Sequence, residues 1–207
     1  MYRGSWWIYM FLLSAISWGW SGDGSIPAEQ TIFVRLYNPA RVNEKELARA
    51  TAHVDRIFSQ AGIRVKWSFC VGGYPLPEGD PCLDTGDPAT LSLGLTNAAP
   101  RQAKLNSLGY TETLPLGRWR GAVLYERVEE LAHRYQPMAS QAAILAMVMA
   151  HEMGHMLLAS TTHSNRGVMR ANWSIEDVRL IGQRRLVFSR EEASAMRTRL
   201  LPIRNGH

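Results

Sequence analysis

The chain has 207 residues, which is the length of one domain and is enough to bury a sizeable core. Hydrophobic residues make up 46% and charged residues 20% of it, a composition typical of a globular protein rather than a disordered one. The formal net charge of +5 is moderate, and arginines are concentrated after position 163. The sequence has neither interleaved basic and aromatic residues nor zinc-finger spacing. We therefore expect a solvated basic face and no nucleic-acid partner. We also expect a monomeric protein.

The N-terminal residues have the pattern of a secretory signal. Arg3 precedes an uncharged apolar run over residues 6–18, which is short for a membrane span, and small residues follow it. We expect a signal peptide over residues 1–21, no long propeptide after it, and one domain over residues 22–207. The protein would then be secreted, or reside in the periplasm or cell envelope. The alternatives are an uncleaved anchor, which would be its only membrane contact, and a buried helix.

Cys70 and Cys82 are the only cysteines in the chain. In an exported protein, such a pair most simply forms one disulfide, here closing a loop rich in Gly, Pro and Asp. The alternative is a pair of thiolate zinc ligands. It is disfavoured because neither cysteine belongs to a C-x-x-C pair.

The first third of the chain predicts a strand, a helix and a second strand. Residues 31–37 are rich in β-branched and aromatic side chains, and residues 63–69 alternate apolar with polar ones. Between them, Asn43 and Glu46 resemble a capping box, apolar residues recur at helical spacing, and Gly62 is placed to end the helix. This order predicts a right-handed parallel βαβ unit.

The rest of the chain predicts shorter strands and four helices. Gly109 and Pro115 are typical of an edge strand rather than a central one. The expected strands cover residues 90–95, 108–113 and 121–128. The expected helices lie over residues 128–135, over 140–158, within 175–186, and from a capping box of Ser189 and Glu192 to residue 200.

The most informative segment is His151-Glu152-Met153-Gly154-His155. Residues 141–150 before it are apolar on nearly every side, so the helix is expected to be buried. Two histidines four residues apart lie on one helix face and can bind one metal ion, which would satisfy them as buried polar groups. Glu152 beside them fits the H-E-x-x-H pattern of zinc hydrolases. The alternative is a buried helix whose histidines only bond to backbone, which leaves the buried Glu152 without a purpose.

This motif, followed by His163-Ser164 and Gly167-Val168-Met169, resembles the metzincin clan of zinc metallopeptidases. The resemblance implies an α+β fold of the zincin type: a mixed twisted sheet with a βαβ start, an active-site helix, and a small C-terminal part with a terminal helix. The upper part would cover residues 30–158 and the lower part residues 159–207. It also implies a third histidine ligand, and it makes Met169 the packing residue of a turn beneath the metal.

The chain departs from the clan pattern after the active-site helix. The pattern H-E-x-x-H-x-x-G-x-x-H would place glycine at 158 and histidine at 161, whereas this chain has Leu158 and Thr161. Threonine is a poor zinc ligand, so we take His163 as the third ligand. Without the glycine, we expect the helix to end without the usual left-handed residue.

These features predict a zinc-dependent endopeptidase acting on peptides or proteins. His151, His155 and His163 would hold Zn²⁺ and leave a position open, while Glu152 would act as the general base for the attacking water. The edge strand at Gly109 and Tyr110 would pair with the substrate backbone.

Two alternatives to this reading remain open. One is a zincin hydrolase whose third ligand is Glu176 or Asp177. The other is an exported zinc-binding or interaction protein without turnover, although such a protein would not need Glu152. No sequence pattern identifies an oxyanion-stabilising residue. Tyr110 and Trp173 are candidates, but no motif supports either of them.

Overall fold

The computed structural model describes residues 30–71, 82, 89–101, 103–104, 106–114 and 118–201. The predicted signal peptide over residues 1–21 lies outside these residues, as does most of the chain between Cys70 and Cys82. The two cysteines themselves form the predicted disulfide, with their Cα atoms 5.7 Å apart.

Five strands form one mixed sheet in the order β2-β1-β3-β5-β4. Three of its strand pairs are parallel, and β4 lies antiparallel to β5 at one edge, where glycine and proline had predicted an edge strand. The strands are β1 (Gln30–Tyr37), β2 (Ile63–Cys70), β3 (Thr90–Thr96), β4 (Gly109–Leu114) and β5 (Arg118–Leu124).

The βαβ start is confirmed. Helix α1 (Glu44–Gln60) connects the parallel strands β1 and β2. The Asn43 side chain accepts from the backbone N–H of Lys45, and Gly62 follows the helix at φ +74°. Glu46 does not close a capping box with Asn43; its carboxylate instead accepts a hydrogen bond from the Tyr125 hydroxyl at 3.0 Å.

Four more helices follow: α2 (Tyr125–Arg134), α3 (Gln141–Leu158), α4 (Ile175–Gly182) and α5 (Arg190–Leu200). The predicted strand over residues 121–128 was wrong in its second half, because the chain turns into α2 directly after β5. Tyr125, Val128 and Ala132 are buried at helical spacing, so burial of this face favours helix from residue 125 onward.

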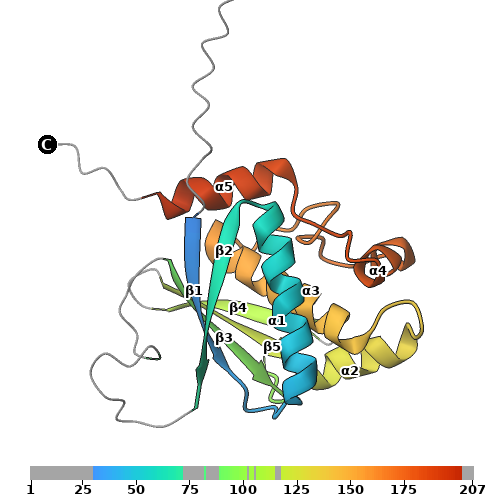
Figure 1. Cartoon of the computed structure of the whole chain (residues 1–207). Helices are drawn as coiled ribbons and strands as arrows, with labels where there is room; N and C mark the ends of the chain where they lie inside the picture. Colours follow the sequence, from blue (N-terminus) through green and yellow to red (C-terminus); the bar gives the residue numbers. More distant parts are fainter. Residues whose placement is uncertain are drawn as a thin grey trace, which may run out of the picture.

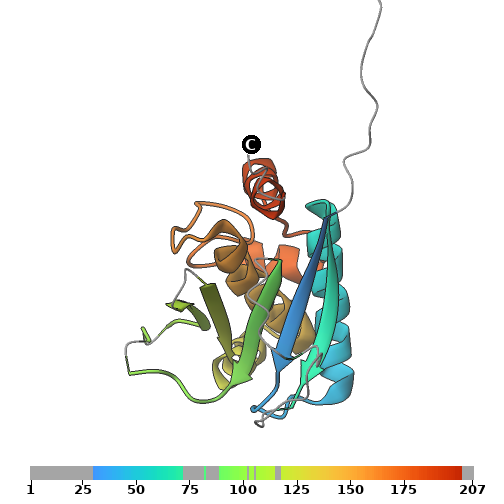
Figure 2. The ribbon, with the colours of Figure 1, turned by 90° about the vertical axis from the view of Figure 1, so that its left-hand side faces the viewer.

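Helix α3 is the centre of the core. It packs on β3, β4 and β5 from one side of the sheet and contacts α1, α2, α4 and α5 (Figure 1). Figure 2 views the molecule from the side of the sheet, with the strands in front. Every residue of α3 from Ala143 to Leu157 is buried, which explains why its sequence is apolar all round. Among the residues described, no helix combines the length and apolarity that crossing a membrane requires.

Candidate metal centre

His151 and His155 lie one turn apart on α3, and their Nε2 atoms are 3.0 Å apart. Two tetrahedral ligands of one zinc ion would stand about 3.3 Å apart at Zn–N distances near 2.05 Å. Their Nδ1 atoms lie 2.7 Å from backbone carbonyl oxygens, that of His151 from Val168 and that of His155 from Ser160. Both imidazoles are thus fixed in orientation by segments that follow the helix in the chain.

The hydrogen-bond partners determine which ring nitrogens carry hydrogen. A carbonyl oxygen only accepts, so each Nδ1 must be the donor and each neutral ring leaves its Nε2 without hydrogen. Burial lowers the pKa of His151 to about 4 and also lowers that of His155, so both rings are neutral at pH 7. Two bare Nε2 lone pairs therefore face each other in the core, and a cation between them would satisfy both.

His163 comes from the loop after α3 and joins this pair. Its ring centroid lies 4.8 Å from that of His155 and 5.2 Å from that of His151. One ligand atom from each of the three residues lies within 4.8 Å of the others. Desolvation and the nearby Lys104 lower the pKa of His163, so this ring is also neutral. The structure brings together the three histidines predicted as ligands, and three neutral imidazoles fit a divalent metal such as zinc.

The loop reaches this position through a left-handed residue, contrary to our expectation. Ala159 adopts φ 45° and ψ 48°, and the backbone N–H of Ser160 donates to the carbonyl of His155. The helix thus ends with the left-handed turn that glycine gives in the clan pattern, one residue later and on an alanine. From this turn the loop runs back along the helix. His163, which lies two residues later in the chain than the histidine of the clan pattern, thus reaches His151 and His155.

Met169 packs against α3 at Gly154. The residue is 1% exposed, and a Cβ placed on Gly154 would stand 2.5 Å from its Sδ atom. The absence of a side chain at Gly154 therefore lets Met169 pack directly against the helix backbone. This geometry suits the packing role that the resemblance implies for Met169.

Glu152 points to the edge of the sheet. Its Oε2 accepts a hydrogen bond from the Thr111 hydroxyl at 2.6 Å, and a Cβ placed on Gly109 would stand 2.5 Å from its Oε1. Burial raises the pKa of Glu152 to about 7, against the opposing effect of the Thr111 hydrogen bond. Glycine at 109 therefore makes room for the carboxylate, which is poised to bind or release a proton near neutral pH.

A cleft of about 790 Å³ lies over the three histidines and Glu152. Residues 108–111 of the β4 region, including Gly109 and Tyr110, form part of its lining, together with residues 170–173 and several residues of α2. The Trp173 ring stands edge-on to His151 with centroids 6.2 Å apart. The cleft thus joins the predicted ligands to the edge strand expected to bind substrate.

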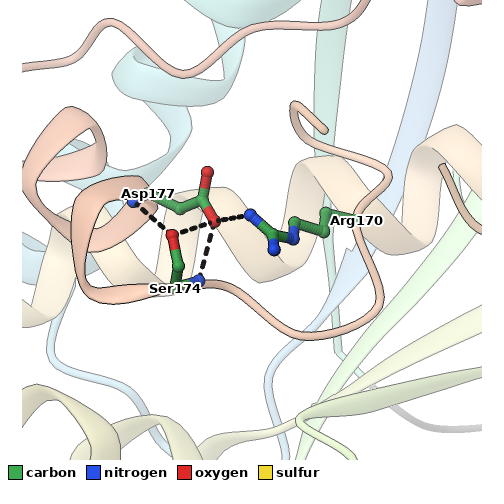
Figure 3. A network of polar contacts seen from close by, with 3 residues as sticks. All are labelled: Arg170, Ser174 and Asp177. Atoms are coloured by element: carbon green, nitrogen blue, oxygen red, sulfur yellow. Dashed lines mark hydrogen bonds and ion pairs between the residues drawn. The ribbon is translucent and has the colours of Figure 1, made fainter. Parts of the chain in front are cut away.

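The two carboxylates considered as alternative ligands are engaged elsewhere. Asp177 Oδ2 accepts from Arg170 Nη1, from the Ser174 hydroxyl and from the Ser174 backbone N–H, each at 2.7 Å (Figure 3). These contacts overcome its partial desolvation and lower the pKa of Asp177. Glu176 forms an exposed ion pair with Arg179 at 2.6 Å. Neither joins the histidine cluster among the described residues.

Sequence reasoning missed Thr111 and the two carbonyl groups that hold the histidines. Thr111 had one usable signal: it stands two residues after Gly109 in an edge strand, so both face the same side. The carbonyls of Ser160 and Val168 carry no side-chain signal. Their contacts depend on how residues 159–169 fold back along α3.

No protein-family model matches this chain, and no curated protein sequence does. The solved structures that resemble its fold include two with a TM-score of 0.50 each. Metalloproteinase-II from Bacteroides fragilis is 12% identical over 83% of this chain and 53% of that one, so the chain spans about half of its length. Archaemetzincin from Methanopyrus kandleri is 18% identical over 86% of this chain and 99% of that one. The chain therefore has an α+β fold similar to those of a metalloproteinase and an archaemetzincin.

Proposed function

We propose that this protein is a zinc-dependent endopeptidase. The observation that carries the proposal is the pair of Nε2 atoms 3.0 Å apart, each left without hydrogen because its ring donates from Nδ1 to a carbonyl. A buried arrangement of two facing lone pairs is unfavourable unless a cation binds between them. His163 supplies the third imidazole of a site that keeps one position open, as catalytic zinc sites do.

The protein groups around this site have separate roles in peptide hydrolysis. Zinc bound there would polarise the scissile carbonyl and acidify the attacking water. Glu152 would accept a proton from the attacking water and donate it to the leaving amine, a task suited to a carboxylate whose pKa is raised to about 7. The β4 edge, from Gly109 onward, binds the substrate backbone as an added strand.

The remaining proposals concern location and partners. The Cys70–Cys82 disulfide supports an oxidising location, either outside the cell or in the periplasm or cell envelope. The protein acts there as a monomer on peptide or protein substrates. Residues 1–21 serve as its signal peptide.

Digestion of a peptide library by the zinc-loaded protein tests this function, with Glu152→Gln as the matched variant. We expect the parent to cleave peptides, and the variant to bind zinc nearly as well but to lose most hydrolysis, because an amide cannot accept the proton. Cleavage at the parent rate by Glu152→Gln would disprove the general-base role. Tight zinc binding by a parent that cleaves nothing would favour the non-catalytic zinc-binding alternative.

The ligand set is tested separately by zinc titration against a competing chelator. We expect His163→Ala to weaken zinc affinity severely and abolish hydrolysis, whereas Glu176→Ala and Asp177→Ala do neither. Unchanged affinity in His163→Ala, with loss in either acidic variant, would establish the carboxylate-ligand alternative instead.

A further inference from the structure

His163 differs from the other two histidines in how it is held. His151 and His155 are buried, and each donates from Nδ1 to a backbone carbonyl. His163 is exposed, and within the described chain its ring has contacts with the other two histidines but no hydrogen bond. Its position must therefore come from the backbone on either side of it.

The residue after it, Ser164, is held through both its backbone and its side chain. Its backbone N–H donates to the Met169 carbonyl at 2.8 Å, as part of an isolated parallel β-bridge with Arg170. Its hydroxyl donates to Glu192 Oε1, on the first turn of α5, 28 residues further along the chain. The Ser164–Glu192 contact thus ties the His163 loop to the C-terminal helix.

Glu192 serves two elements at once. Its Oε2 accepts from the Ser189 backbone N–H at 2.8 Å, while the Ser189 hydroxyl accepts from the Glu192 backbone N–H at 3.1 Å. This capping box was predicted from the sequence and needs only one carboxylate oxygen. The other oxygen binds Ser164, and Glu192 is only 8% exposed although it carries a charge.

We propose that Ser164 and Glu192 are positioning residues for His163, so that metal affinity depends on the docking of α5. This inference rests on the metal centre of the proposed function. Ordering a loop backbone costs conformational entropy, and the Ser164–Glu192 contact meets this cost before metal binds. Without the contact, binding would have to order the loop, and about 1.4 kcal/mol corresponds to a tenfold loss of affinity.

The test compares zinc affinity, measured against a competing chelator, with the thermal unfolding temperature of the metal-free protein. Ser164→Ala removes the contact and leaves the capping box. Ser189→Ala removes the capping hydroxyl and leaves the contact, so it is the matched control. We expect Ser164→Ala to weaken zinc affinity about tenfold, and Ser189→Ala to lower the unfolding temperature while zinc affinity stays within about twofold of the parent.

A second variant approaches the contact from the other side. Glu192→Asp keeps the charge and can still cap α5, as Asp177 does with Ser174 in the capping box of α4 (Figure 3). Its carboxylate is one methylene shorter and cannot serve both Ser189 and Ser164. We expect Glu192→Asp to weaken zinc affinity as Ser164→Ala does, with no further loss in the double variant, because both remove the same contact.

Parent-like zinc affinity in both Ser164→Ala and Glu192→Asp would overturn the inference. Equal weakening in Ser164→Ala and Ser189→Ala would also overturn it, because general destabilisation of α5 would then be the cause. A parent that does not bind zinc is a different result, which would refute the proposed function itself.

Discussion

Replacement of Ala159 by glycine should stabilise the protein. Ala159 is held at φ 45° and ψ 48°, where the Cβ of an L-residue approaches the following carbonyl oxygen and costs about 1–2 kcal/mol. Glycine removes this strain but loses more conformational entropy on folding, by about 0.5–1 kcal/mol. The net gain in the free energy of unfolding should be about 0.5–1 kcal/mol.

For a chain of this size, 1 kcal/mol corresponds to a rise of about 2–4 °C in the midpoint of thermal unfolding. The midpoint of Ala159→Gly should therefore rise by roughly 1–4 °C, measured by circular dichroism on metal-free protein. Ala48→Gly is the control, because Ala48 is exposed inside α1 and the same substitution there should destabilise by about 1 kcal/mol.

Opposite signs for the two alanine-to-glycine variants would confirm that the strain at Ala159 is real. If Ala159→Gly destabilised the protein as much as Ala48→Gly does, Ala159 would not be left-handed in solution. The account of how the loop returns His163 to the helix would then fail with it.

Three further changes have expected outcomes. Gly154→Ala should lower the free energy of unfolding in urea, because the added Cβ would stand 2.5 Å from Met169 Sδ. Such overpacking destabilises by about 1–3 kcal/mol, which outweighs the gain of about 1 kcal/mol from the higher helix propensity of alanine. Burial lowers the pKa of His53 from 6.5 to about 4, so the unfolded chain takes up this proton first and stability falls as pH drops from 6.5 to 4. Between pH 7 and pH 4.5, the free energy of unfolding in urea should therefore fall by about 2–3 kcal/mol less in His53→Leu than in the parent. Thr111→Val should lower kcat/KM roughly tenfold or more at unchanged zinc affinity, because the Glu152 carboxylate loses a hydrogen bond worth about 1.5–3 kcal/mol, and Thr111→Ser should restore it.

Each of these expectations has a contrary outcome. Parent-like stability in Gly154→Ala would mean that Met169 does not pack closely on the helix. Equal acid sensitivity in His53→Leu and its parent would place the responsible protons on other groups. Equal losses in Thr111→Val and Thr111→Ser would indicate that packing, rather than the hydroxyl, positions Glu152.

The sequence predicted most elements because their signals are local. Apolar spacing and the residues around Asn43 and Gly62 mark α1, and an unbroken apolar run marks α3. The boundary between β5 and α2 was misplaced because no glycine, proline or capping side chain separates them, and Leu124 makes no side-chain cap. Where no turn residue intervenes, tertiary packing decides at which residue the strand becomes a helix.

The parts of the site that could be predicted are those whose residues lie close together in the sequence. Spacing along one helix places His151 beside His155, and His163 is the next imidazole after them. The contact of Thr111 with Glu152 spans 41 residues and that of Ser164 with Glu192 spans 28, so neither has a local pattern. Ala159 was beyond prediction for another reason: propensity favours glycine there, and the fold imposes the left-handed conformation despite the cost.

The position of β4 at the end of the sheet has a consequence for solubility. A strand with unpaired backbone groups invites pairing with another copy of the same chain, which is the first step of aggregation. β4 has only six residues, begins with glycine, and carries Glu112 in an ion pair with Arg120 of the neighbouring strand. Short and charged edges resist such growth. The strand proposed to bind an extended substrate peptide is thereby protected from pairing with β4 of another copy of the chain.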